Sequence, residues 1–280
     1  MKTAIVTDST AYISLEERQL YNIHMIPLSV ILEDGTYEEE VEITTSEFYQ
    51  KVRETKTFPK TTQPPVGKFV ELFEKLSKEH DEVVSIHLSS GISGTYQGAH
   101  QAGNMVDNIN VSVFDSEIAC YVQGMFVVEA AKMAQQGATA QEIMDKLESL
   151  KTTMDAYFVV DDLSHLQRGG RLSAAAALIG GLLQVKPVLH FVDKVIVPFE
   201  KIRTRKKALR RVEEMLAEAV HKHGELQATV IHSCCEEEAL QWMQQLQETY
   251  PSVDFKLSYF GPVIGTHLGE GAIALGWMKK

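Results

Sequence analysis

The chain has 280 residues and a formal net charge of −11, with 44% hydrophobic and 23% charged residues. This balance is typical of a soluble globular protein, and the length is comfortable for two domains. The acidic charge disfavours nucleic acid as a main partner and unaided docking on an anionic membrane, because both interactions require a basic face.

The first half of the sequence alternates between strand and helix patterns. Pro27 makes the second predicted strand irregular or an edge strand. Capping-box patterns at Thr44 and Thr139 and an apolar stripe from Phe69 to Leu76 predict helices. Such alternation with short connections predicts a mostly parallel sheet covered on both faces, with ligands at the carboxyl ends of the strands. The predicted strands are 4–6, 25–32, 83–88 and 111–114.

The second half has a different pattern. Two strand segments flank Asp193-Lys194 and predict an antiparallel hairpin, and long amphipathic helices are expected around 209–220 and after Glu236. The sequence therefore predicts an α/β protein with two domains. Residues 1–154 form an α/β sandwich with a mostly parallel sheet, and residues 155–280 form an α+β domain with an antiparallel or mixed sheet.

Cysteine usage and apolar segments restrict the remaining classes. The three cysteines, Cys120, Cys234 and Cys235, make no disulfide framework and match no zinc spacing. The N-terminus lacks the apolar core of a signal peptide, and the most apolar later stretch, 174–183, is too short to span a bilayer. We therefore expect a cytoplasmic protein without a metal.

The segment Ser89–Thr95 is the most informative part of the chain. It combines two glycines with four hydroxyl groups, follows a predicted strand and precedes a predicted helix. In that arrangement, backbone N–H groups and the positive helix end can hold an anion. The loop lacks the lysine of a Walker A motif, so it suits a carboxylate or a single phosphate. An ordinary strand-to-helix turn is the alternative interpretation.

Four further segments carry groups that could contact an anion. Each also has an ordinary interpretation: a capped helix start, solvated arginines, a solvated basic face or a structural histidine. The basic cluster Arg203–Lys207 lies at a helix start, the wrong end for the helix dipole, which indicates a nearby anion or acidic partner. The other three are the loop 60–65 with Thr61, the segment 163–173 with Arg171, and the glycine-dense loop 261–271 with His267.

Taken together, these segments resemble the DegV family. The resemblance covers nearly the whole chain, and its strength lies in the joint order of motifs that are weak singly. The matching segments are Thr7–Thr10, Thr61–Pro64, Ser89–Tyr96, Asp115-Ser116, Leu163–Ser173, Lys186-Pro187, Arg203-Thr204 and Gly261–Gly271.

The resemblance implies a specific function. DegV proteins are two-domain lipid binders, similar to the fatty-acid-binding subunit of bacterial fatty acid kinase. In that system a separate ATP-using kinase subunit converts the bound fatty acid to an acyl phosphate, which acyltransferases use for phospholipid synthesis. The resemblance thus implies a carrier that is not itself an enzyme, with a long-chain fatty acid as ligand, no other cofactor, and transient membrane contact left open.

Carried over by position, the resemblance also assigns residues. Thr61, Ser93, the Gly94 N–H and His267 would hold the fatty-acid carboxylate. Arg171 and Arg203 would lie near the head group or contribute to kinase docking.

Two other functions remain open on the sequence. The chain could be a stand-alone phosphotransferase or hydrolase that uses Ser93 or His267, although Ser93 lies in no Gly-x-Ser-x-Gly elbow. It could also be a lipid-dependent sensor that docks an acidic surface through Arg203–Lys207.

Overall fold

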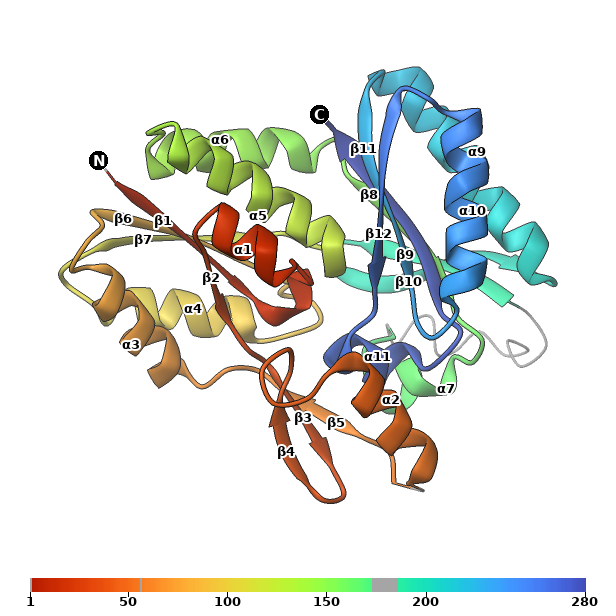
Figure 1. Ribbon diagram of the computed structural model, residues 1–280, viewed down its shortest axis with the longest axis horizontal. Coiled ribbons are helices and arrows are strands. Elements are labelled where there is room, and N and C mark those ends of the chain that lie inside the picture. Colours follow the sequence, from red (N-terminus) through yellow and green to blue (C-terminus); the bar gives the residue numbers. More distant parts are fainter. Residues whose placement is uncertain (1, 56, 173–185) are drawn as a thin grey trace. The chain divides into compact units, whose positions relative to one another are not determined.

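The computed structural model describes residues 2–55, 57–172 and 186–280. The chain divides into two compact units, Met1–Thr152 and Thr153–Lys280. Figure 1 colours the first from red to green and the second from green to blue.

A four-stranded parallel sheet forms the centre of the N-terminal unit. Its strand order is β2-β1-β6-β7, and all three strand pairs are parallel. Helices α3 and α4 lie on one side of this sheet, and α5 and α6 on the other (Figure 1). The predicted parallel sheet covered on both faces is therefore confirmed. The strands are β1 (Thr3–Asp8), β2 (Ile23–Ile26), β6 (Glu82–His87) and β7 (Asn110–Asp115).

The helices of this unit begin where the side chains can cap them. Thr44 and Thr139 each form a reciprocal capping box with the glutamate three residues later. Phe69 and Phe73, both fully buried, carry the predicted apolar stripe into the core against the sheet. The helices are α1 (Leu15–Leu20), α2 (Thr45–Glu54), α3 (Val66–Leu76), α4 (Thr95–Gly103), α5 (Cys120–Gln135) and α6 (Ala140–Lys151), with a 3-10 turn η1 (Ser9–Ala11).

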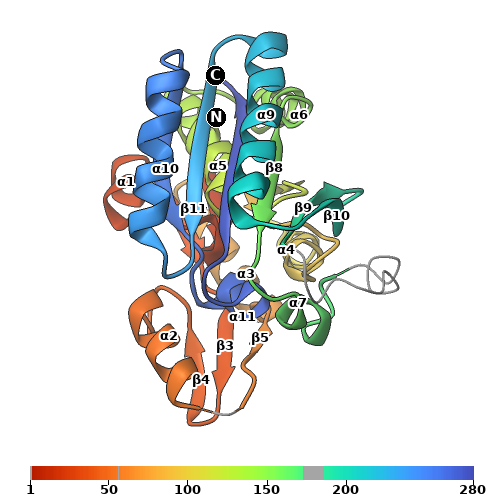
Figure 2. The same ribbon diagram turned by 90° about the vertical axis from the view of Figure 1, so that its right-hand side faces the viewer.

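A second, three-stranded antiparallel sheet lies in the same unit, in the order β4-β3-β5 (Figure 2). It corrects two predictions. The single strand predicted at 25–32 is divided between two sheets, because Pro27 lies between β2 and β3 and has no N–H for a ladder. The segment predicted as a loop around Thr61 begins with a strand. The three strands are β3 (Ser29–Leu32), β4 (Gly35–Glu38) and β5 (Lys60–Thr62).

The C-terminal unit is built on a six-stranded mixed sheet, with the order β10-β9-β8-β13-β11-β12. Among the described strands, the β11–β12 pair is parallel and the other pairs are antiparallel. This confirms the predicted mixed sheet. The strands are β8 (Asp155–Val159), β9 (Lys186–Val192), β10 (Val195–Ile202), β11 (Leu226–His232), β12 (Val253–Tyr259) and β13 (Ile273–Lys279).

Helices α9 (Arg205–His223) and α10 (Glu236–Thr249) share one core with this sheet, which includes Leu216, Trp242 and Trp277. The predicted hairpin is confirmed: β9 and β10 are joined at Asp193 and Lys194, whose φ angles of 47° and 73° suit a two-residue turn.

Two short helices complete the described part of this unit, α7 (Ser164–Arg168) and α11 (Pro262–Leu268). The second was predicted as part of a glycine-dense loop. Ser173 and the apolar stretch 174–183 lie outside the described residues. Within the described ranges, none of the helices has the length and apolar character needed to cross a membrane.

Candidate functional site

The glycine loop forms a compact turn that ends at the start of α4. The Ser93 N–H donates to the carbonyl of Ser89 over 3.2 Å, and the Ser89 N–H donates to the carbonyl of Ile118 over 2.7 Å. The Ser93 hydroxyl lies 2.8 Å from the Thr95 hydroxyl, and Gly94 is the N-cap residue of the helix. Ser93 and Gly94 are half-buried. A hydroxyl and a helix N-terminus are thus placed together, as anion binding requires.

Strand β5 brings Thr61 towards this loop. Thr61 pairs with Val30 of β3, and the chain continues to Gln63. A Cβ on Gly94 would collide with the amide oxygen of the Gln63 side chain, so glycine permits this close approach. The N-terminal unit therefore brings together the two segments that carry Thr61, Ser93 and Gly94.

A buried polar network lies at the carboxyl ends of β1 and β6, beside the glycine loop. The Asp8 carboxylate is fully buried and accepts the Leu88 N–H over 3.0 Å. His87 places Nδ1 2.9 Å from Asp8 Oδ2 and Nε2 2.7 Å from the Ser85 hydroxyl. His87 and Ser85 were not predicted as functional residues from the sequence. The available signal was the alternation of polar residues within an apolar strand that ends beside a candidate loop.

In the C-terminal unit, His267 lies in α11 and is 8% exposed. A Cβ on Gly169 would collide with its Nδ1, so the turn after α7 packs directly on the imidazole. Burial first, and then the charges of Arg171 and His165, lower the pKa of His267 to about 3. The imidazole is therefore neutral at physiological pH, with one nitrogen that donates and one that accepts.

Arg171 is brought to the same place. Its Nη1 donates to the carbonyl of Gly169 over 2.5 Å, and the side chain is half-buried. Burial lowers the pKa of Arg171, but a guanidinium stays charged in proteins. Gly169 thus contacts both the charged guanidinium of Arg171 and the neutral imidazole of His267.

The basic cluster at the start of α9 is divided between two roles. Arg205 forms a bidentate pair with Glu238, with Nε–Oε1 and Nη2–Oε2 distances of 2.7 and 2.8 Å, and lies 3.4 Å from Asp161. For Arg205, the acidic partner that the sequence indicated is therefore found within the same unit, in Glu238 and Asp161. Arg203 is exposed, directly before the capping residue Thr204.

Comparisons with known proteins agree over the whole chain. Residues 2–280 match the family model described as "Uncharacterised protein, DegV family". The chain is 55% identical to Protein DegV of Bacillus subtilis (strain 168) over 281 residues, with 100% of both sequences covered.

Two solved structures illustrate the structural likeness. The crystal structure of DegV, a fatty acid binding protein from Bacillus subtilis, has a TM-score of 0.96 and 54% identity, and covers 100% of both chains. A DegV family protein from Thermus thermophilus, described for its fatty acid binding, has a TM-score of 0.94 and 30% identity, again over 100% of both chains.

Proposed function

The chain belongs to the DegV family, and from this membership we propose that it binds a long-chain fatty acid and presents the carboxylate to a separate ATP-dependent kinase subunit. The kinase subunit then forms the acyl phosphate, which acyltransferases consume. The fatty acid binding described for relatives at 54% and 30% identity supports the first part of this proposal. The carrier itself catalyses no step.

The carboxylate is held by Thr61, Ser93, the Gly94 N–H and His267. The observation that carries this assignment is the meeting of the Thr61 and Ser93 segments, where the Gln63 side chain packs on Gly94 at the N-cap of α4. In the other unit, burial lowers the pKa of His267 to about 3 and keeps the imidazole neutral. A neutral imidazole beside Arg171 still carries one N–H, so it can donate a hydrogen bond to an anion at neutral pH without becoming protonated. Hydroxyl and backbone donors satisfy the remaining carboxylate lone pairs, which would otherwise be costly to desolvate.

The two arginines serve the charged product and the encounter with the kinase. Arg171 is half-buried next to His267 and favours the additional negative charge of an acyl phosphate. Arg203 is exposed and is available to the kinase subunit.

The acyl chain supplies most of the affinity. A tail of about fifteen methylenes contributes on the order of 12 kcal/mol of transfer free energy before ordering costs are subtracted. The polar residues therefore set the orientation of the ligand more than the strength of binding.

Mass spectrometry under denaturing conditions tests the carrier role. The purified protein is expected to release a saturated or unsaturated long-chain fatty acid, and the delipidated protein is expected to rebind palmitate. A lipid-free protein that fails to bind added palmitate would contradict the proposal.

Phosphoryl transfer is tested with labelled ATP. Acyl phosphate is expected only when a kinase subunit is added. Turnover of ATP and palmitate by the isolated chain would instead favour the stand-alone phosphotransferase, with Ser93 or His267 as the reacting group.

A further inference from the structure

We infer that Asp8 and Ser9, here called the β1 hub, position the head-group residues of the N-terminal unit. Asp8 fixes the start of the loop 89–94, which carries Ser93 and is here called the first arm. Ser9 fixes the start of β3, which pairs with the strand of Thr61; β3 and β5 are here called the second arm. This inference rests on the proposed fatty-acid site and assigns the hub a positioning role within it.

Asp8 holds the first arm of the site. One oxygen, Oδ2, accepts the Leu88 N–H and faces His87 Nδ1, at 3.0 and 2.9 Å. The other, Oδ1, accepts the N–H and the hydroxyl of Thr10, at 3.1 and 2.6 Å. Leu88 is the last residue before the loop 89–94, so the origin of that loop is fixed by a charge-assisted bond to β1.

Ser9 holds the second arm. Its hydroxyl accepts the Leu28 N–H over 3.0 Å and donates to Glu39 Oε2 over 2.7 Å. Glu39 is fully buried, accepts the Tyr12 hydroxyl over 2.9 Å, and donates its own N–H to the Leu28 carbonyl over 2.9 Å. Leu28 directly precedes β3, the strand that pairs with Thr61.

The two arms meet again at their far ends, where the Gln63 side chain packs on Gly94. The hub therefore lies at one end of both arms, and the contact between Gln63 and Gly94 lies at the other end. A shift of either arm at Asp8 or Ser9 therefore changes the spacing between the Thr61 and Ser93 segments.

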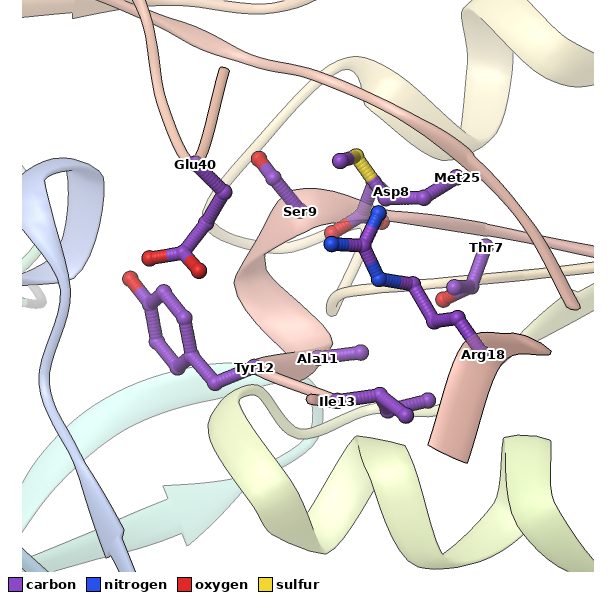
Figure 3. A pocket seen from close by; sticks show the side chains of 9 residues that line it. All are labelled: Thr7, Asp8, Ser9, Ala11, Tyr12, Ile13, Arg18, Met25 and Glu40. Atoms are coloured by element: carbon purple, nitrogen blue, oxygen red, sulfur yellow. The ribbon is translucent and has the colours of Figure 1, made fainter. Parts of the chain in front are cut away.

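The hub acts through these arms and not by direct contact with a ligand. The cavity beside Asp8 and Ser9, into which Arg18 and Glu40 also point, has a volume of about 10 Å³ (Figure 3). That is room for about one water molecule and not for a fatty acid.

Stability alone is a weak reason for such a network. Buried ionic groups are often no more stabilising than well-packed apolar residues of similar volume, because the charges must be desolvated. The bonds of Asp8 and Ser9 include those to the backbone N–H groups of Leu88 and Leu28, where the two arms begin.

The test compares ligands that differ only at the head group. Delipidated protein is titrated with palmitate and with hexadecanol, and the ratio of the two dissociation constants measures head-group recognition. The variants are Asp8→Asn and the milder Ser9→Ala, with Ile143→Ala as a control. Ile143 is fully buried in α6, a helix that belongs to neither arm, so its truncation destabilises the same unit without removing a hydrogen bond of the hub.

Both hub variants are expected to lose about tenfold of the preference for palmitate, while hexadecanol binding is retained. Carbon-13 labelling of the palmitate carboxyl is expected to show a shifted resonance for the bound ligand in these variants and not in Ile143→Ala. If Asp8→Asn does not fold, Ser9→Ala decides the outcome.

Two results would overturn the inference. If the hub variants keep the wild-type preference for palmitate while Ser93→Ala loses it, the proposed function stands and Asp8 and Ser9 have no positioning role. An equal loss of preference in Ile143→Ala would mean that general destabilisation of the unit, and not the hub, explains the effect. Failure of the proposed function gives a different result, because the wild type itself would then bind no palmitate.

Discussion

The two units position their proposed head-group residues by different physical means. In the N-terminal unit, the loop that carries Ser93 follows Leu88, whose N–H donates to the buried Asp8 carboxylate. The strand that pairs with Thr61 follows Leu28, whose N–H donates to the Ser9 hydroxyl. In the C-terminal unit, His267 is held by the direct packing of Gly169. The N-terminal loop meets only the end of a flexible side chain at Gly94, and that side chain can rotate away, whereas a close contact between a backbone and a buried ring leaves no such freedom.

Gly169→Ala is expected to have the largest effect. The new methyl would collide with His267 Nδ1, and the ring is only 8% exposed, so either the turn or the imidazole must move. We expect a loss of about 1–3 kcal/mol of stability and at least about a tenfold loss of palmitate preference over hexadecanol. Urea unfolding and ligand titration measure the two effects.

Gly170→Ala is the matched control for that substitution. Gly170 has a φ of 68° and open space around its Cβ position, so alanine strains the turn without contacting His267. Its ligand preference is expected to equal that of the wild type. A loss as large as that of Gly169→Ala would mean that turn strain, and not the imidazole, controls recognition.

Ser93→Ala is expected to have the next largest effect. It removes a hydroxyl proposed to donate to the carboxylate, at a cost of roughly 1–3 kcal/mol in palmitate binding. Calorimetric titration with palmitate measures the change. Ser90→Ala makes the same chemical change in the same half-buried loop and is expected to bind normally. Equal affinities for wild type and Ser93→Ala would remove this hydroxyl from the site.

The pH dependence of stability tests the C-terminal unit alone. The pKa of His267 is lowered from 6.5 to about 3 in the folded protein. Between pH 6.5 and pH 3 the unfolded chain therefore binds a proton at this residue and the folded chain does not. The stability that neutral His267 contributes to the folded state is fully present above pH 6.5 and is lost as the pH falls towards 3. The slope is at most about 1.4 kcal/mol per pH unit.

His267→Gln isolates that contribution. The difference in free energy of unfolding between wild type and His267→Gln is expected to change between pH 6.5 and 4.5 and to be constant above pH 7. His221→Gln, which removes an exposed imidazole from α9, serves as the control. A difference curve for His267→Gln that is as flat as the control would contradict the lowered pKa.

Local patterns predicted those parts of the fold that local interactions decide. The capping boxes at Thr44 and Thr139 are contacts within three residues, and the spacing of Phe69 and Phe73 is that of one helix face. The three-residue strand β5 was missed, because so short an edge strand has no periodicity and exists only through its pairing with β3. Helix α11 was missed because its segment is dense in glycine, which is typical of loops. Gly269, directly after the helix, lies against the His165 ring.

The residue types of the candidate site were also visible in the sequence, but their surroundings were not. Asp8 and His87 are 79 positions apart, and Gly169 and His267 are 98 apart, so only the folded chain joins them. The pKa of His267 depends chiefly on burial, which no local pattern around residue 267 encodes.

Gly94→Ala is expected to have the smallest effect, although its methyl collides as closely as that of Gly169→Ala. The atom it meets is the far end of the Gln63 side chain, which is exposed and can rotate away. We expect less than about 1 kcal/mol of lost stability and a palmitate preference close to wild type, because the Gly94 N–H is retained. The measurements are those made for Gly169→Ala. A loss as large as for Gly169→Ala would show that the N-terminal loop is as rigid as the C-terminal turn, and the contrast between hydrogen-bonded and steric positioning would no longer hold.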